Sequence, residues 1–426
     1  MKKTAVYTIT SGLHDEASVS KLSDEFLAGI FPEGDFDFKG ADFSDFGSHP
    51  LDLIYVRTGG AEGIFRSLFP TLLKSGAGRF HLLTSGKSNS LAASLEILSW
   101  LRQQGYPGEV LHGSAEYLQE RIGILAKVGE ARRRLSGQRI GVVGKPSDWL
   151  ISSDADPRAV RTRLGVAIED IPMEELLAAI SDGAPAAPGA PSAATAPPAG
   201  DGGIPSAPSG GEIPAPAPGT AQKVRDAFPG AVRIHDALRS LVSRYRLDAL
   251  TLRCFDLLGS VGNTGCLALA ALNSSGIPAS CEGDVPALLS MMIAHALTGV
   301  TGFQANPARI DIQTGEMLFA HCTIPFGMVS DWQYDTHFES GIGVGIHGHF
   351  PEGPVTVFKV SGDLGRHFVS EGELTANQYE DNLCRTQVVL RLPPEDAGYF
   401  LKDPIGNHHI ILPGHWKNLL EEFMAR

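Results

Sequence analysis

The first 180 residues alternate short apolar runs with amphipathic segments. Runs rich in β-branched and aromatic residues occupy positions 3–9, 51–60, 79–86 and 108–113, and residues 90–105 repeat their apolar positions with a helical period. Strands that alternate with helices of this length form βαβ units, whose strands are parallel. The pattern therefore predicts a parallel sheet with helices on its faces.

A second series of the same kind starts near residue 139. A strand-like run at 139–152 is followed by a helical segment at 159–165 and a further strand at 166–172. Later in the chain, a helical pattern at 223–246 leads into the strand-like run 247–255. These segments predict a second parallel-sheet α/β domain.

The character of the chain changes after about residue 314. Strand-like runs at 316–324, 355–362, 387–392 and 408–414 follow one another with few helical signals, and a helix is predicted at 416–424. Consecutive strands without crossover helices are typical of antiparallel sheets and barrels. The predicted fold class is α/β, with two N-terminal parallel-sheet α/β domains and a C-terminal α+β domain that contains an antiparallel β-barrel-like part.

The 426 residues exceed the size of one ordinary core, and we expect domains at 1–136, 137–250 and 251–426. Within the second domain, residues 183–219 consist almost entirely of Ala, Pro, Gly and Ser. Such a segment buries too little apolar surface to offset its ordering entropy. It is predicted to be a disordered insert without core contacts.

The overall composition indicates a soluble, cytoplasmic protein. No apolar run is long enough to span a membrane, and the N-terminal segment lacks the apolar core of a signal peptide. The five scattered cysteines form no CxxC pair, which fits reduced thiols. A net charge of −13 argues against a nucleic-acid partner. Gly141 and Gly144 do not have the spacing of a dinucleotide site, so no such cofactor is expected.

Two acidic residues follow a predicted buried strand in the segment 277–292. Glu282 and Asp284 come at the carboxyl end of the strand, and Pro286 then opens a helix at a position where its missing N–H costs nothing. Ligands of open α/β sheets bind at this edge. Asp284 alone is explained equally well as a helix cap. Glu282, which follows a buried strand, is the stronger candidate for a functional carboxylate.

Three histidines lie in predicted strands of the C-terminal domain. A lone histidine in an apolar strand, such as His321, is more often a hydrogen-bonded core residue than a ligand. His408 and His409 are adjacent, and neighbours on a strand point to opposite faces, so that one can face a cavity while the other packs. With Glu282, such imidazoles make a plausible ligand set for Mn²⁺, Zn²⁺ or Fe²⁺.

The segment 251–307 strongly resembles the metal-binding region of the L-fucose isomerase and L-arabinose isomerase superfamily. Residues 89–98 and 139–152 resemble the N-terminal α/β domains of fucose isomerase-like proteins, and the nearest likeness is to the uncharacterised fucose isomerase-like branch. The resemblance implies an aldose–ketose isomerase that moves a proton between carbons 1 and 2 of a sugar through an enediol. It also implies a divalent metal, with Mn²⁺ as the first candidate.

Position by position, Glu282 matches the glutamate that binds the metal and acts as acid and base in the superfamily. His321 resembles the mid-domain histidine ligand of the arabinose enzymes, and either His408 or His409 resembles the C-terminal histidine ligand. The second essential carboxylate of the fucose enzymes falls on Asn306. An amide oxygen can bind a hard cation, but it carries no negative charge and accepts no proton. Asn306 therefore departs from the two-carboxylate mechanism of the family.

Other polar residues are candidates to complete such a site. Asp284 and Asp311 are the acids nearest to Asn306 that could substitute for the missing carboxylate. Four residues in turn-rich segments of the C-terminal domain are candidate contacts to sugar hydroxyls, although exposed loop positions explain them equally well: His347, His349, Asp363 and Arg366.

Three functions stay open at this point. The first is a metal-dependent isomerase of a free fucose-like or arabinose-like sugar. The second is a sugar- or metal-binding protein of the same fold that lost catalysis when Asn306 replaced the acid, and the third is an epimerase or lyase that uses one carboxylate. Because neighbouring subunits complete the site in the family, the resemblance also implies a homo-oligomer, either a trimer or a hexamer.

Overall fold

The computed structural model describes residues 2–76, 78–183 and 213–425. The chain divides into two compact units, Met1–Arg133 and Arg134–Arg426. The first unit contains a parallel sheet, and the second contains another parallel sheet together with a closed antiparallel barrel. These features confirm the predicted fold class.

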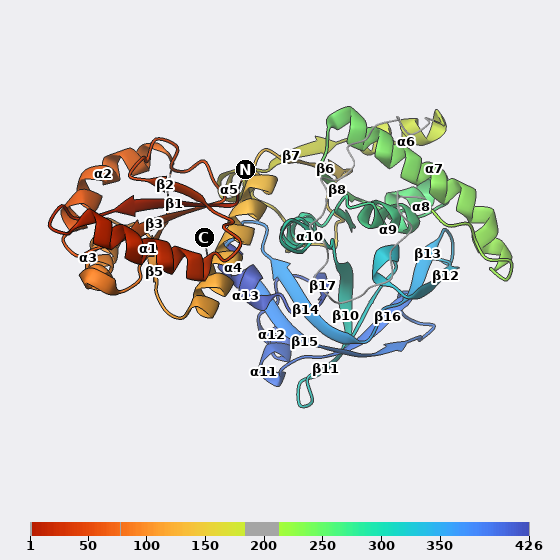
Figure 1. Ribbon diagram of the computed structural model, residues 1–426. Coiled ribbons are helices and arrows are strands. Elements are labelled where there is room, and N and C mark those ends of the chain that lie inside the picture. The colour runs from red at the N-terminus through yellow and green to blue at the C-terminus, as the bar shows by residue number, and fades with distance from the viewer. Residues whose placement is uncertain (1, 77, 184–212, 426) are drawn as a thin grey trace. The chain divides into compact units, whose positions relative to one another are not determined.

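The first unit is built on a five-stranded parallel sheet in the order β2-β1-β3-β4-β5 (Figure 1). Its strands are β1 (Thr4–Ile9), β2 (Asp37–Gly40), β3 (Leu51–Val56), β4 (Phe80–Leu83) and β5 (Gly108–Leu111). The helical elements are α1 (Glu16–Ile30), α2 (Glu62–Lys74), η1 (Lys87–Asn89), α3 (Ser90–Gln103) and α4 (Ala115–Leu135). Helices α1 and α4 bury their apolar side chains against one face, and α2 and α3 do so against the other.

The parallel sheet of the second unit has four strands in the order β7-β6-β8-β9. These strands are β6 (Arg139–Val143), β7 (Ala167–Ile171), β8 (Ala249–Leu252) and β9 (Ala279–Cys281). Its helices are α5 (Pro157–Leu164), α6 (Met173–Ser181), α7 (Gln222–Tyr245), α8 (Asp256–Val261), α9 (Cys266–Ser274) and α10 (Val285–Thr298). Apolar side chains of α6, α7 and α9 share one core with the strands of this sheet.

The barrel closes through six antiparallel strands in the order β10-β11-β16-β15-β14-β17. The strands are β10 (Phe303–Asp311), β11 (Glu316–His321), β14 (Gly353–Val360), β15 (His367–Gln378), β16 (Thr386–Arg391) and β17 (His409–Pro413). A separate hairpin joins β12 (Asp331–Asp335) to β13 (Gly345–His349). Short helices are η2 (Phe326–Met328), α11 (Pro394–Ala397), α12 (Tyr399–Lys402) and α13 (Lys417–Met424).

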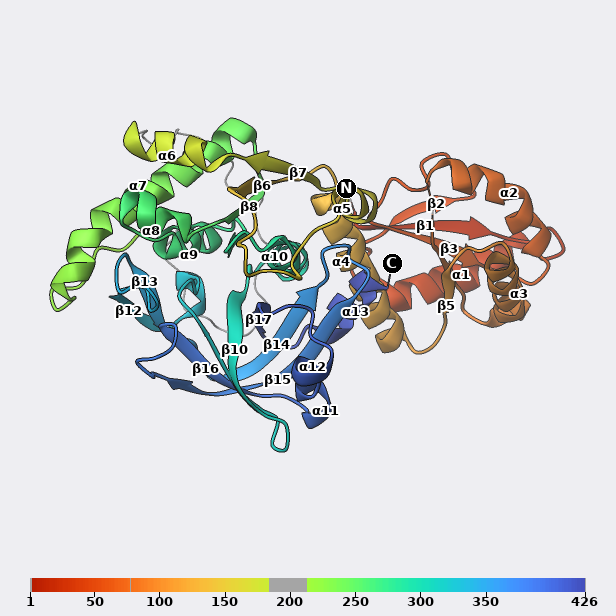
Figure 2. The ribbon, with the colours of Figure 1, turned by 180° about the vertical axis from the view of Figure 1, so that it is seen from behind.

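Helix α10 joins the parallel sheet to the barrel within the second unit. It contacts β8 and β9 on one side and β14 and β17 on the other, and both views show it between the two layers (Figures 1 and 2). Asp284 caps its first turn, Pro286 lies in that turn, and Gly299 ends it in a left-handed conformation. The carboxyl end of β9 is thereby placed next to the barrel.

The predicted insert can be followed only at its ends, because residues 184–212 lie outside the described residues. At its C-terminal end, Ile213 packs against the core of the second unit, and Tyr334 Oη donates a hydrogen bond to Pro214 O at 2.7 Å. This end of the stretch therefore contacts folded chain, in contrast to the expectation that all of 183–219 lacks core contacts.

Two further expectations concern the chain as a whole. All five cysteines are free thiols, and four of them are buried. Among the residues that the structure describes, we find no helix with both the length and the apolarity that a membrane span requires.

Candidate active site

Glu282 occupies the tight turn between β9 and α10. Its φ is +65° and that of Gly283 is +73°, so both residues are left-handed. A non-glycine residue rarely adopts this conformation, and such strain is typical of functional sites. The turn is held by Ser147, whose N–H donates to Glu282 O at 2.9 Å. Gly283 is required here, because a Cβ would lie 2.6 Å from Lys145 O.

Two side chains contact the buried carboxylate of Glu282. Trp149, in the loop after β6, donates its indole N–H to Oε2 at 2.6 Å. His408 Nε2 lies 3.4 Å from Oε1, an ion-pair distance that is too long for a well-formed hydrogen bond. Each carboxylate oxygen therefore has its own partner, and the side chain is held in one orientation.

A fully buried ion pair supports His408 from behind. Its Nδ1 lies 2.9 Å from Asp284 Oδ2, and Lys359 Nζ lies 3.4 Å from the same oxygen. Asp284 also caps α10, since its Oδ1 accepts from Ala287 N–H at 2.7 Å. A histidine whose Nδ1 is bonded to a carboxylate presents Nε2 outward, which is the usual arrangement of metal-binding histidines.

His321, at the end of β11, completes a three-residue group. Its Nδ1 lies 2.9 Å from Thr323 Oγ1, so Nε2 is the nitrogen left for a ligand. The rings of His321 and His408 have centroids 5.4 Å apart. One potential ligand atom from each of Glu282, His321 and His408 lies within 4.8 Å of the other two, and all three residues are buried.

Asn306 brings a fourth potential ligand to the same region. Gln304 on β10 accepts a hydrogen bond from Cys281 N–H at 2.8 Å, which ties β10 to the end of β9. Asn306 lies two residues further along the same strand face. Its Oδ1 is buried and has no hydrogen-bond partner among the described residues, and the same holds for His408 Nε2. Buried polar atoms without partners next to a carboxylate fit a divalent cation.

The charges of the group stabilise one another. Burial, the largest effect, raises the pKa of Glu282, but the neighbouring imidazoles outweigh it and lower this pKa to about 2. Burial lowers the pKa of His408, but Asp284 and Glu282 raise it to about 9. Burial and the charge of His408 lower the pKa of His321 to about 3. Within the three-residue group, the pKa of the carboxyl group is thus lowered, and the pKa values of the two imidazoles are shifted in opposite directions.

Glu282 of this group lines a pocket of about 310 Å³. The residues that line it are Trp149, Phe255, Glu282, Asn306, Glu339 and Asn407. Trp149 and Phe255 pack edge to face with ring centroids 4.9 Å apart and make one side apolar. The lining residues include two acids and no Lys or Arg. A pocket of this size, lined by four polar residues and two aromatic ones, suits a small polar molecule.

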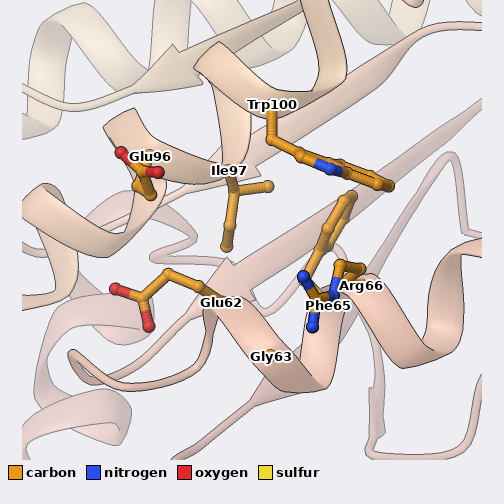
Figure 3. Close-up of a pocket in the computed structure, with 7 residues that line it drawn as sticks. All are labelled: Glu62, Gly63, Phe65, Arg66, Glu96, Ile97 and Trp100. Atoms are coloured by element: carbon orange, nitrogen blue, oxygen red, sulfur yellow. The ribbon is translucent and has the colours of Figure 1, made fainter. Parts of the chain in front are cut away.

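The first unit has a pocket of its own, of about 230 Å³, between α2 and α3. Figure 3 shows the rings of Phe65 and Trp100 on one side of it and the carboxylates of Glu62 and Glu96 on the other. Its lining contains no histidine and no group of ligand atoms like that around Glu282.

The adjacent histidines point in opposite directions, as expected for neighbours on a strand. His409 faces the aromatic side chains of the barrel, where its Nε2 lies 3.1 Å from Tyr399 Oη and its ring centroid lies 4.6 Å from that of Phe400. Burial is the main cause that lowers the pKa of His409 to about 3. The structure therefore places His408, and not His409, beside the acids.

The predicted histidines of β13 do not reach the pocket lining. The ring of His347 stacks on Tyr379 with centroids 4.8 Å apart. His349 ends the same strand, where its carbonyl oxygen accepts from Ser330 N–H at 2.9 Å. Neither residue lies among those that line the pocket.

The remaining predicted acids and the arginine also lie elsewhere. Asp363 and Arg366 belong to the turn between β14 and β15, and Arg366 pairs with the exposed Asp403 at 2.6 Å. Asp311 ends β10 in an exposed turn, and Asp284 is fully buried behind His408. Neither of the two acids proposed as substitutes for a carboxylate at Asn306 lines the pocket.

Five residues around the site were not predicted, namely Trp149, Phe255, Glu339, Lys359 and Asn407. Trp149 follows β6 at the same sheet edge as Glu282, so its position after a predicted strand was a usable signal. Lys359 interrupts an apolar strand, and a lone lysine in such a run indicates a buried partner. Glu339 lies in an irregular loop and carried no local signal.

A buried carboxylate and two imidazoles at a sheet edge, beside a pocket, define a candidate metal centre of an α/β protein.

The chain is similar to proteins named sulfoquinovose isomerase. The relative from Clostridium sp. (strain MSTE9) is 32% identical over 140 residues, which are 33% of this chain and 29% of that protein. Those from Alkalicoccus urumqiensis and Priestia aryabhattai are 22% identical over 245 residues and 23% over 293 residues.

The two longer matches cover 55% and 64% of this chain, and 49% and 59% of the relatives. The chain thus spans at most about three fifths of the length of these proteins. No protein-family model matches it. The similarities relate the chain to sugar isomerases, in agreement with the resemblance seen in residues 251–307.

Proposed function

We propose that this protein is a metal-dependent aldose–ketose isomerase of a free sugar. The observation that carries the proposal is the buried group of Glu282, His321 and His408, of which Glu282 lines a pocket together with Asn306. Its donors are one carboxylate, two imidazoles and an amide oxygen, which suit Mn²⁺ and other divalent transition metals. His408 is the proposed C-terminal histidine ligand, because His409 faces the barrel interior.

The side chains around the pocket can perform the proton transfer that isomerisation requires. A divalent metal would polarise the sugar oxygens and stabilise negative charge on them. Glu282 lines the pocket and has a carboxylate that can accept a proton from carbon 2. Trp149 fixes one of its oxygens, and the strained backbone at Glu282 holds the side chain toward the pocket. The apolar side formed by Trp149 and Phe255 suits the C–H face of a sugar.

For the substrate we propose an uncharged aldose of the fucose or arabinose type. The pocket is lined by two acids and by no Lys or Arg, so it offers no charged partner to an anionic sugar. A sulfonated sugar is the second candidate, because the relatives are named sulfoquinovose isomerases. A panel of L-fucose, L-arabinose and sulfoquinovose separates the two.

The experiment measures deuterium exchange at carbon 2 and ketose formation with each sugar, in the presence of Mn²⁺ and after chelation. Wild type should exchange and isomerise, and chelation should abolish both. Glu282→Gln should reduce turnover by about 10²–10⁴-fold, because the amide keeps a ligand oxygen but accepts no proton. Glu316→Gln, an exposed change at the start of β11, is the matched control and should behave as wild type.

A catalytically inactive binding protein is the competing function, since Asn306 stands where the family has an acid. If the wild type binds a sugar but exchanges no proton with any metal, the isomerase proposal fails. If Asn306→Asp then gives exchange, the binding protein lost catalysis through this single change. Exchange with epimer formation and no ketose would instead indicate an epimerase.

The expectations of a cytoplasmic location and of a trimer or hexamer stay predictions. Light scattering on the purified protein would determine the oligomeric state. A monomer with full activity would show that one chain completes the site.

A further inference from the structure

Isomerisation through an enediol needs a second proton-transfer group besides Glu282. One group removes the carbon-bound proton while another protonates the carbonyl oxygen. Asn306 cannot do this, because an amide neither donates nor accepts a proton at neutral pH. Asp284 is fully buried and paired with Lys359, and Asp311 lies in an exposed turn at the far end of β10.

Glu339 is the second carboxyl group that lines the pocket. It lies in the loop between β12 and β13 and shares the pocket with Glu282, Asn306 and Trp149. Glu339 is exposed, and no hydrogen bond or ion pair within the described residues engages its carboxyl group. It is therefore available to a bound molecule.

The loop is anchored by hydrogen bonds on both sides of Glu339, so the backbone at this residue is held in place. His337 Nδ1 lies 3.0 Å from Ser340 Oγ, and Gly341 N–H donates to His337 O at 2.9 Å. Arg385 Nε donates to Thr336 O at 2.8 Å. The ring of His337 also packs edge to face against Phe255, on the apolar side of the pocket, with centroids 5.4 Å apart.

At the end of the loop, Gly343 lies against the start of α9. A Cβ at this position would lie 2.4 Å from Thr264 Oγ1, so only glycine permits this close approach. Its φ of +69° is likewise a conformation that favours glycine.

We propose that Glu339 is the second catalytic carboxyl group of this site and protonates the sugar carbonyl oxygen; this inference rests on the proposed isomerase function. In the first step Glu282 takes the proton from carbon 2, the C–H electron pair becomes the second bond between carbons 1 and 2, and oxygen 1 takes the proton of Glu339. In the second step Glu339 takes the proton of the hydroxyl on carbon 2, the carbonyl forms there, and Glu282 returns its proton to carbon 1. No proton or electron is gained or lost overall.

The positions of the two carboxyl groups suit these opposite roles. Trp149 and His408 hold the buried carboxylate of Glu282, whereas Glu339 reaches the same pocket from an exposed loop position and has no side-chain partner among the described residues. The loop thus supplies an acid from a segment unrelated to the position that Asn306 occupies.

The test compares Glu339→Gln with Asp331→Asn, which makes the same chemical change at an exposed position at the start of β12. Turnover, KM, Mn²⁺ affinity by calorimetry and thermal midpoint are measured for both variants and wild type. Glu339→Gln should lower kcat by about 100-fold or more while KM stays within about threefold. Its Mn²⁺ affinity and thermal midpoint should equal those of wild type, and Asp331→Asn should match wild type throughout.

Three results would overturn the inference. The first is that the wild type is active and Glu339→Gln has the same kcat. The second is that the substitution raises KM and leaves kcat unchanged, which would make Glu339 a binding residue. The third is a loss of Mn²⁺ affinity, which would make it a metal ligand. If the wild type itself shows no exchange at carbon 2, the isomerase proposal fails. This outcome differs from a failure of the Glu339 inference, which requires an active wild type.

Discussion

The two parallel sheets of this protein have polar residues at the same edge but use them differently. At the carboxyl edge of the first sheet, Thr84 Oγ1 donates to Ser90 Oγ at 2.8 Å, and Ser11 N–H donates to Thr58 Oγ1 at 2.9 Å. These polar groups therefore provide hydrogen-bond partners for one another. At the edge of the second sheet, Glu282 is approached by Trp149 of the same edge and by His408 from the barrel.

The difference lies in what covers each edge within its own unit. In the second unit, the barrel brings His408 and His321 to the carboxyl end of β9. A parallel sheet alone supplies acids and hydroxyls at strand ends, whereas the imidazoles come from antiparallel strands distant in sequence. The sheet edge becomes a candidate metal centre only where a second layer contributes ligands.

The two sheet edges also differ in whether their buried polar side chains have hydrogen-bond partners. Arg57 of the first unit is buried and hydrogen-bonds Ser23, Thr10, Glu16 and Ser20. In the second unit, Asn306 Oδ1 is buried without a partner among the described residues. Buried polar atoms without a hydrogen-bond partner occur elsewhere in both units as well, so the position of Asn306 in the pocket beside Glu282 is what favours a ligand there.

The largest effect on stability is expected from Lys359→Met. Lys359 is 1% exposed and pairs with the fully buried Asp284, so the substitution leaves a buried carboxylate with fewer partners. Removing one partner of a buried ion pair costs about 3–5 kcal/mol. Urea unfolding would measure this loss, and the exposed Lys402→Met is the matched control. A loss below about 1 kcal/mol would show that His408 alone balances Asp284.

A smaller effect, confined to catalysis, is expected from Trp149→Phe. The substitution removes the donor to Glu282 Oε2 but keeps an aromatic ring against Phe255. Hydrogen bonds to charged groups contribute about 1.5–3 kcal/mol, so kcat/KM should fall by about 10- to 100-fold. Trp416→Phe removes an indole hydrogen bond to Pro413 O and should leave turnover unchanged. Equal kinetics of the two variants would contradict a positioning role of Trp149.

The smallest effect is expected at the edge of the first sheet. Thr84→Val removes the hydrogen bonds of the buried Thr84 hydroxyl with Ser90 Oγ and with Gly86 N–H. We expect a loss of about 1 kcal/mol in unfolding free energy and no change in turnover. Kinetics and chemical unfolding of this variant test whether the two edges differ in function. A drop in kcat would show that the first edge also takes part in the reaction.

Local patterns in the sequence were sufficient for several parts of the site. A buried strand followed by Glu282, a capping Asp284 and Pro286 predicts both β9 and the start of α10, because strand ends and helix caps depend on neighbouring residues. The opposite directions of His408 and His409 follow from the period of a strand. These features are properties of short segments.

The tertiary structure alone decided which distant residues meet. Trp149 lies 133 positions from Glu282, and His408 lies 124 positions from Asp284. Nothing in either segment specifies its partner, because the closing of the barrel and the packing of α10 depend on contacts spread over the whole second unit. Glu339 is the clearest case. Its loop has no periodicity, so only the folded chain places its carboxyl group in the pocket that Asn306 lines.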